Sequence, residues 1–391
     1  MQKKQSHFFQ GDLIILLVLL ITVSLLSIYN AQQLEQYEGR NFVMMQIFWY
    51  ALGILILAAM QFFDLDQMYR ASFIIYGVTV LLLIILWVSP SSIAYPVNGA
   101  KSWFNKLPGL TLQPSEFTKI GLIVYLAAII NKHKNKYKVA TMNSDVKLLI
   151  KMGIVLAIPI LFTMVQPDMG TSLVYVFITG VLIILSGIDW KIIMTLIAGI
   201  LAAAVLAVFI IVEFPDFAKD VLHIKPYQMD RVMTWFDHSQ QTNNDTFQID
   251  RSMQALGSGQ LTGKGMSALQ VSLPEAQTDF IFSVVGESFG FIGSAAVILL
   301  YFLLLYKLVT LGIKVYEQNP FGSYICFGFM ALLLMHTFQN IGMTIGIMPI
   351  TGIPLYFLSY GGSSVLAAMV GYGMVYRVAV DHSIHNDYLF K

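Results

Sequence analysis

LPEAQTDFIF, residues 273–282, is the stretch at which a long polar segment ends and a strongly apolar one begins. A proline followed by an acid is typical of a helix start, with the proline at the first helical position. If Pro274 holds that position, Asp279 lies roughly 7.5 Å along the helix axis, at about 1.5 Å per residue. That is past the first turn, where a carboxylate no longer caps free N–H groups. We therefore expect a functional role for Asp279; the alternative is an ion pair between helices.

The composition is that of a membrane protein. Of the 391 residues, 57% are apolar and only 12% are charged, and the mean hydropathy is +0.71, whereas soluble domains carry about 25% charged residues. A net charge of +1 argues against nucleic acid as a partner. The single cysteine, Cys326, excludes an internal disulfide and a cysteine-based metal cluster. The N-terminal apolar run has no small-residue cleavage site after it, so we expect a retained helix.

Ten apolar segments are long enough to cross a membrane, which takes about 20 residues. They cover residues 12–30, 42–63, 70–89, 114–131, 147–165, 170–187, 190–212, 279–306, 322–345 and 354–377. The sequence therefore predicts an all-α polytopic membrane protein, organised as one integral membrane domain over residues 1–391. A long extracytoplasmic segment, residues 213–278, is expected between spans seven and eight.

Lysine and arginine set the expected orientation, because they are enriched in short cytoplasmic loops. The N-terminus, the loops after spans four and eight, and the C-terminal tail are all basic. With ten spans these segments fall on one side, so both termini are predicted to be cytoplasmic. Four polar clusters then share the outer face: residues 98–119, 166–171, 254–279 and 349–364. We expect them to form an outward-facing site.

The first cluster contains a lysine and a glutamate close to a predicted helix start. Pro114 predicts the first helical position, which makes Glu116 the third residue, where a carboxylate can reach free N–H groups. Lys119 lies three residues further on and shares a helix face with Glu116. A lysine at this depth needs a carboxylate partner, an anionic ligand or room to extend outward. Glu116 is therefore expected either to cap the helix or to orient Lys119.

The other clusters each allow a structural and a functional interpretation. Asp168 directly follows Pro167 and is expected to cap a helix. Residues 257–265 are rich in glycine but fail the phosphate-binding P-loop pattern, because Ser258 and Gly265 stand at two of its required positions. This backbone can still approach a diphosphate closely; the alternative is a flexible surface loop. Residues 349–364 predict a broken helix covered by protein or a water-filled cavity, or tight packing through small residues.

Seven motifs in a fixed order carry a family resemblance: NGAKSWF (98–104), QPSEFTK (113–119), QPDMGTS (166–172), QALGSGQLTGKG (254–265), LPEAQTDFIFSVVGE (273–287), QNIGMTIGIMPITGIP (339–354) and SYGGSS (359–364). Together they resemble the SEDS family, the bacterial membrane proteins of shape, elongation, division and sporulation. Residues 340–354 are more similar to the rod-elongation branch than to the division branch. Two positions depart from the family pattern: Tyr356 stands where a second proline is usual, and Ser102 where a second basic residue is common.

The resemblance implies a peptidoglycan glycosyltransferase of the bacterial plasma membrane. Such an enzyme polymerises lipid II, a disaccharide peptide linked through a diphosphate to undecaprenol, and works with a class B penicillin-binding transpeptidase. The resemblance implies that Asp279 is the catalytic residue and that Glu116, Lys119 and Asp168 act in activity or substrate handling. Converting an α-linked donor into a β-1,4 product requires inversion. That needs one general base at the acceptor hydroxyl and positive charge at the leaving diphosphate.

We assign the base to Asp279 and the first diphosphate contact to Lys119, followed by Lys101 and Lys264. Glu275 and Ser359 lie in the same motifs and complete the predicted substrate-binding residues. A divalent cation such as Mg²⁺ or Mn²⁺ would help to neutralise the diphosphate, although no motif specifies a metal site. Two other functions stay open. A lipid II flippase or other transporter would also suit embedded charges and broken helices, and a non-catalytic scaffold for a transpeptidase would need neither Asp279 nor Lys119.

Overall fold

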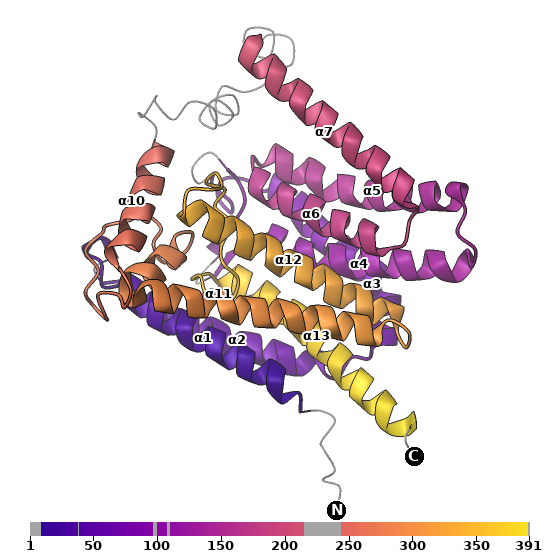
Figure 1. Ribbon diagram of the computed structural model, residues 1–391, viewed down its shortest axis with the longest axis horizontal. Helices are drawn as coiled ribbons and strands as arrows, with labels where there is room; N and C mark the ends of the chain where they lie inside the picture. Colours follow the sequence, from indigo (N-terminus) through magenta and orange to yellow (C-terminus); the bar gives the residue numbers. More distant parts are fainter. Residues whose placement is uncertain (1–8, 38, 97–99, 108–109, 215–243, 390–391) are drawn as a thin grey trace, which may run out of the picture.

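The computed structural model of the protein is a bundle of long helices (Figure 1). It describes residues 9–37, 39–96, 100–107, 110–214 and 244–389, so the predicted extracytoplasmic segment is described only in part. The helices are α1 (Gly11–Ala31), α2 (Phe42–Met60), α3 (Leu65–Val88), α4 (Pro114–Lys136), α5 (Met142–Val165), α6 (Met169–Leu185), α7 (Trp190–Glu213), α10 (Asn244–Ser258), α11 (Ile281–Val315), α12 (Pro320–Thr344) and α13 (Gly362–Leu389), with a short 3-10 helix, η1 (Glu35–Tyr37).

The all-α membrane architecture predicted from hydropathy is confirmed. Among the described residues, eight helices are long and apolar enough to cross a membrane: α1, α2, α3, α5, α7, α11, α12 and α13. The other two predicted spans also correspond to helices. One is α6, which has 17 residues, and the other is α4, whose last turn carries basic side chains. Each of the ten predicted spans therefore coincides with a helix.

The core of the bundle lies along α12 and α13. The apolar windows of these two helices are 78% and 94% buried, whereas that of α7 is 6% buried, and α7 stands at the rim of the bundle (Figure 1). Small residues allow close approach between the central helices, since a Cβ at Gly328 would lie 2.5 Å from Ile123 and one at Gly371 would lie 2.4 Å from Phe329. Close packing through small residues is typical of helices in membranes.

Two predicted helix starts are wrong. The helix expected from Pro274 begins at Ile281, and the span expected from residue 354 begins as a helix only at Gly362. Both segments instead form turns, and Glu275 takes a positive φ of 51° that an α-helix does not allow. The two turn segments bond to each other: the Tyr360 N–H donates to the Gln277 carbonyl at 2.8 Å. Polar backbone groups that would be satisfied within helices are thus satisfied between distant segments.

The glycine-rich segment 257–265 packs on the backbone of α11. That helix is interrupted at Gly290, where φ is 65° and ψ is −160°, and the freed backbone groups bond to the segment. The Lys264 N–H donates to the Glu287 carbonyl at 2.9 Å, and the Phe291 N–H donates to the Gln260 carbonyl at 2.8 Å. A Cβ at Gly263 would lie 2.2 Å from the Ser288 carbonyl oxygen. The glycines therefore permit contact with α11, and the flexible-loop alternative is wrong.

A short antiparallel hairpin precedes α4 and was not predicted. Its strands are β1 (Phe104–Leu107) and β2 (Leu110–Leu112), and Phe104 pairs with Leu112. The Ser363 hydroxyl, at the start of α13, donates to the Thr111 carbonyl at 3.0 Å and accepts from the Gln113 N–H at 2.9 Å. The hairpin is therefore tied to the SYGGSS motif, and this tie fixes the start of α4 beside α13.

Candidate active site

Asp279 lies in a turn, residues 274–280, directly before α11. Its backbone is held firmly: the Asn340 side-chain amide on α12 donates to the Asp279 carbonyl at 2.8 Å and to the Ile353 carbonyl at 3.0 Å. Its carboxylate is partly exposed, and among the described residues nothing forms a hydrogen bond or ion pair with it. A Cβ built on Gly352 would lie 3.5 Å from Asp279 Oδ2. The carboxylate therefore lies beside the loop 345–361, on a backbone that is held in place, and is free to accept a proton.

The environment of Asp279 favours its protonated form. Burial raises the pKa of this carboxyl from its ordinary 3.8 to about 7, and the negative charge of Glu275 adds to the effect. Desolvation and a like charge both disfavour ionisation of an acid. A carboxyl with a pKa near neutrality is suited to take a proton from an acceptor hydroxyl and to release it again. Our prediction that Asp279 lies inside a helix is wrong, but its lack of a capping role agrees with the structure.

Glu116 and Lys119 form a buried ion pair on α4. The helix begins at Pro114 as predicted, and Lys119 Nζ lies 2.7 Å from Glu116 Oε1, with each side chain 2% exposed. The second carboxylate oxygen of Glu116 accepts from the Tyr356 hydroxyl. Glu116 therefore orients Lys119 and does not cap the helix. Because the ammonium of Lys119 is covered, direct contact with a diphosphate requires the cover to move.

Two residues that were not among the predicted site residues, His336 and Tyr356, complete this cluster. His336 on α12 places Nε2 3.1 Å from Lys119 Nζ and Nδ1 2.7 Å from the Pro354 carbonyl oxygen. The Tyr356 ring lies 3.9 Å from the His336 ring, centroid to centroid, and 5.5 Å from Lys119 Nζ. A histidine inside an apolar span is itself a signal, since polar side chains are costly there. That signal was available for His336, whereas Tyr356 stood out only as a departure from the family pattern.

Asp168 caps α6, as predicted from its place after Pro167. Its carboxylate accepts from the Thr171 N–H at 3.0 Å and from the Thr171 hydroxyl at 2.8 Å. Burial raises the pKa of Asp168, the two bonds from Thr171 lower it, and the charges of Lys119 and Glu116 act on it in opposite directions. Asp168 thus belongs to the same electrostatic environment as the α4 ion pair. It joins that environment through the start of α6.

The other two predicted lysines have partners within the protein. The Lys101 ammonium donates to the Trp87 carbonyl at 3.0 Å and to the Ser89 carbonyl, at the C-terminal end of α3, where a cation is favourable. Lys264 Nζ lies 2.6 Å from Glu287 Oε1. The same oxygen accepts from the Gln270 N–H at 2.8 Å, so Glu287 anchors the segment after the glycine motif. Both lysines stabilise local structure here rather than standing free for a ligand.

Glu275 and Ser359 shape the turn that carries Asp279. The Ser359 hydroxyl donates to the Thr278 carbonyl at 2.6 Å and accepts from the Leu355 N–H at 2.8 Å. The exposed Glu275 accepts from the Thr278 hydroxyl at 3.1 Å. Ser359 is buried, so it positions the turn, while Glu275 contributes charge next to Asp279. The turn, the loop 345–361 and the ends of α4, α6 and α12 together form the candidate site.

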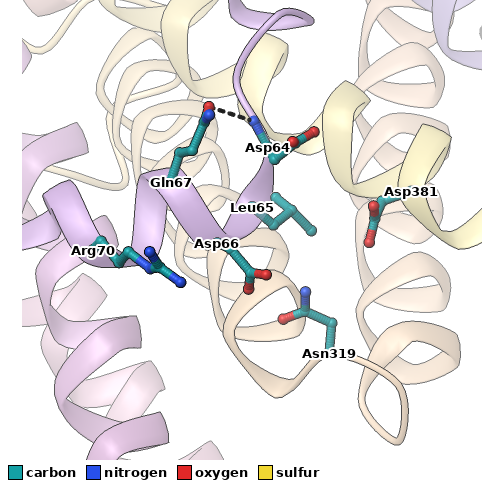
Figure 2. Close-up of a pocket in the computed structure, with 7 residues that line it drawn as sticks. All are labelled: Asp64, Leu65, Asp66, Gln67, Arg70, Asn319 and Asp381. Carbon is teal, nitrogen blue, oxygen red and sulfur yellow. Dashed lines mark hydrogen bonds between the residues drawn. The ribbon is translucent and has the colours of Figure 1, made fainter.

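A polar hollow lies at the end of α12 opposite the candidate site (Figure 2). Its lining is mostly polar and comes from the start of α3, the connection before α12 and the end of α13: Asp64, Leu65, Asp66, Gln67, Arg70, Asn319 and Asp381. Arg377 pairs with Asp64 at 2.6 Å. None of the predicted site residues lines this hollow. Across the described part of the chain, no three histidine, cysteine or acidic side chains are grouped to hold a metal ion.

The fold and the site define a multi-pass membrane protein with a partly exposed acid and a buried lysine–glutamate pair at one end of its bundle. The chain belongs to the cell cycle protein family of FtsW, RodA and SpoVE, which matches residues 4–384. It is 32% identical over 318 residues to the probable peptidoglycan glycosyltransferase FtsW of Wigglesworthia glossinidia brevipalpis, covering 80% of this chain and 77% of the relative. It is 32% identical over 369 residues to the peptidoglycan glycosyltransferase MrdB of Escherichia coli K12, covering 92% of each.

Solved structures show the same fold. The protein superposes with a TM-score of 0.75 on a chain from a study of how a peptidoglycan synthase complex coordinates polymerization and crosslinking, at 25% identity and covering 96% of this chain and 98% of that one. The rod shape determining protein RodA of Thermus thermophilus gives a TM-score of 0.67 at 25% identity, covering 96% and 97%. The resemblance to this family, expected from seven motifs between residues 98 and 364, is therefore confirmed, and the family match extends to residues 4–384.

Proposed function

We propose that this protein polymerises lipid II into glycan strands, with Asp279 as the general base. The class of reaction follows from the family: the chain is a peptidoglycan glycosyltransferase, like the relatives from Wigglesworthia and Escherichia. The role of Asp279 is supported by its carboxyl group, which extends from a hydrogen-bonded backbone, is partly exposed and has a pKa of about 7. No other acid among the predicted site residues combines these properties, since Glu116 and Asp168 are both engaged by neighbours.

The proposed reaction is a single displacement with inversion. Asp279 accepts the proton of the acceptor sugar hydroxyl while that oxygen attacks the anomeric carbon of the donor. The bond from this carbon to the diphosphate oxygen breaks, and the lipid diphosphate leaves with the electron pair. Asp279 then returns its proton to water. A general base of this kind contributes about 10²–10⁴-fold to the rate.

Positive charge near the leaving group is the second requirement, because the diphosphate gains negative charge as the bond breaks. We assign this role to Lys119, which acts from beneath the site because its ammonium is covered by Glu116, His336 and Tyr356. Lys101 and Lys264 act less directly in this proposal. They hold the hairpin and the glycine-rich segment at the site's border, where their own partners retain them.

The finer biological assignment rests on sequence and on the comparisons together. Residues 340–354 are more similar to the rod-elongation branch, and the Thermus RodA structure covers almost the whole chain, so we propose a role in cell elongation and rod shape. FtsW proteins match at a similar identity. Depletion in the source bacterium separates the two roles: rounded cells support elongation, and long undivided filaments support division.

The structural match to a peptidoglycan synthase complex supports a class B penicillin-binding transpeptidase as partner. The orientation stays as proposed, with both termini cytoplasmic and the site facing outward.

The test is polymerisation by purified protein, with and without a transpeptidase partner, supplied with lipid II. Wild-type protein is expected to form glycan strands, and Asp279→Asn to form none at an unchanged or higher melting temperature. Asp66→Asn, at the opposite end of the bundle, is the matched control and is expected to keep activity. Transport of lipid II across vesicles without any polymer would support the flippase alternative and reject this proposal.

A further inference from the structure

Lys119 is held from two sides by residues outside its own helix. On one side, His336 Nδ1 lies 2.7 Å from the Pro354 carbonyl oxygen. A carbonyl oxygen only accepts, so Nδ1 carries the hydrogen and Nε2 of the neutral ring presents a lone pair. That lone pair faces Lys119 Nζ at 3.1 Å. His336 is fully buried, so this acceptor fixes one of the three N–H bonds of the ammonium.

On the other side, Tyr356 contacts every member of the cluster. Its hydroxyl donates to Glu116, and its ring lies against His336 and faces the Lys119 ammonium at 5.5 Å. The tyrosine hydroxyl satisfies the Glu116 oxygen that Lys119 leaves free. A buried carboxylate that lost this donor would rotate toward the ammonium or draw it away from His336, because an unpaired buried acceptor is costly. Tyr356 therefore limits where Lys119 can sit.

Both residues depend on the loop 345–361, which also holds the turn that carries Asp279. Pro354 and Tyr356 lie in the loop 345–361, and the Ser359 hydroxyl of the same loop bonds to Thr278 beside Asp279. Asn340 on α12 bridges this loop and the Asp279 carbonyl, four residues from His336. The positions of the lysine and the acid are thus set by one connected set of hydrogen bonds.

We propose that His336 and Tyr356 are positioning residues. They hold the Lys119 ammonium at a fixed position relative to the Asp279 carboxylate. This inference rests on the proposed glycosyl transfer. The tyrosine hydroxyl adds a donor to the lysine–glutamate pair. Because Lys119 is covered, a loss of this fixed position is expected to lower kcat more than it raises KM for lipid II.

The test compares Tyr356→Phe with Tyr372→Phe in the polymerisation assay. Tyr356→Phe removes only the hydroxyl that bonds Glu116. Tyr372→Phe removes another buried hydroxyl bond, to the Leu13 carbonyl on α1 at 2.7 Å, and keeps the ring that packs against Phe357. We expect Tyr356→Phe to lower kcat about 10-fold with KM within about twofold of wild type, which corresponds to about 1.4 kcal/mol in the barrier. Tyr372→Phe is expected to keep wild-type kcat at a similar melting temperature.

Two histidine variants keep the inference testable if Tyr356→Phe folds poorly. His336→Gln retains a donor and an acceptor and is expected to keep a larger part of kcat than His336→Leu, which has neither, at matched melting temperatures. The inference is overturned if Tyr356→Phe retains wild-type kcat, or if Gln and Leu at 336 are equally active. Either result leaves the proposed function standing as long as the wild type forms polymer. Absence of polymer from the wild type would instead reject the function itself.

Discussion

Replacing Asp279 with asparagine is expected to abolish activity and yet stabilise the protein at neutral and alkaline pH. Asparagine has nearly the shape of the protonated acid but never ionises. The folded protein disfavours ionisation of Asp279, because its pKa is about 7 in place of 3.8. Above pH 7 the wild type must therefore hold a carboxylate in a poorly solvated position. The variant holds a neutral amide there, so the electrostatic free energy of its folded state is lower.

The magnitude follows from the two pKa values. One pH unit corresponds to 1.36 kcal/mol, so the interval from 3.8 to about 7 amounts to about 4 kcal/mol at most, and water at the partly exposed carboxyl reduces this figure. The sign is that of an acid whose pKa is raised by folding. The cost is absent below the unfolded pKa, grows as the pH rises from about 4 to about 7, and stays constant above. Asp279→Asn should therefore gain about a third of the full difference at pH 5 and nearly all of it at pH 8.

The measurement is thermal unfolding in detergent for both proteins at pH 5, 6, 7 and 8, with polymer yield from the same preparations. We expect the melting temperatures to diverge as the pH rises and the variant to form no polymer at any pH. A difference in melting temperature that does not change with pH would refute the raised pKa. Polymerisation by the variant at the wild-type rate would refute the role of Asp279 as base.

Three further predictions concern the surroundings of the site. Asp168→Ala should lose about 0.5–2 kcal/mol of stability, as expected for an N-cap, and keep part of its activity; an inactive variant with wild-type melting behaviour would instead make Asp168 part of the reaction centre. Gly263→Ala should destabilise the protein by about 2 kcal/mol or more, because φ is positive and the new Cβ meets the Ser288 carbonyl. Gly265→Ala shares the positive φ, but a Cβ there would have nothing within 4 Å. An equal loss of stability in the two variants would therefore show that the contact of residue 263 with α11 does not cause the loss. In a variant lacking Cys326, Ser258→Cys should react with an impermeant thiol reagent from outside the cell and Asn135→Cys should not. The reverse labelling would show that the membrane orientation is the opposite of the predicted one.

The pH dependence of activity offers a check that does not depend on unfolding. Activity of the wild type should rise with pH through about 7, since only the ionised carboxylate accepts a proton. Glu275→Gln removes the neighbouring negative charge that helps to raise this pKa. The midpoint of its pH–rate profile should therefore lie at lower pH than that of the wild type. A midpoint that does not move would show that Glu275 has no electrostatic effect on the base.

The features that depend on nearby residues could be predicted from the sequence. Hydropathy placed each of the ten spans on a helix, although the last span was predicted to start too early and α11 and α13 extend well past the predicted ends of their spans. Pro114 marked the start of α4, and the position of Asp168 after Pro167 predicted its cap. The order of the seven motifs predicted the family. All of these follow from the local rules of helix termini and burial, which act over a few residues along the chain.

The chemistry of the site depended on contacts between segments that lie far apart in the sequence. Pro274 has the form of a helix start, yet bonds from Ser359 and Tyr360 hold residues 274–280 in a turn. The sequence predicted that Lys119 could pair with Glu116 or bind an anion, yet His336 also contacts it, from 217 residues away. A local sequence pattern states which groups are costly to bury. Only the tertiary structure decides which distant groups meet that cost, because a buried donor or acceptor takes whatever partner the packing of the helices brings to it.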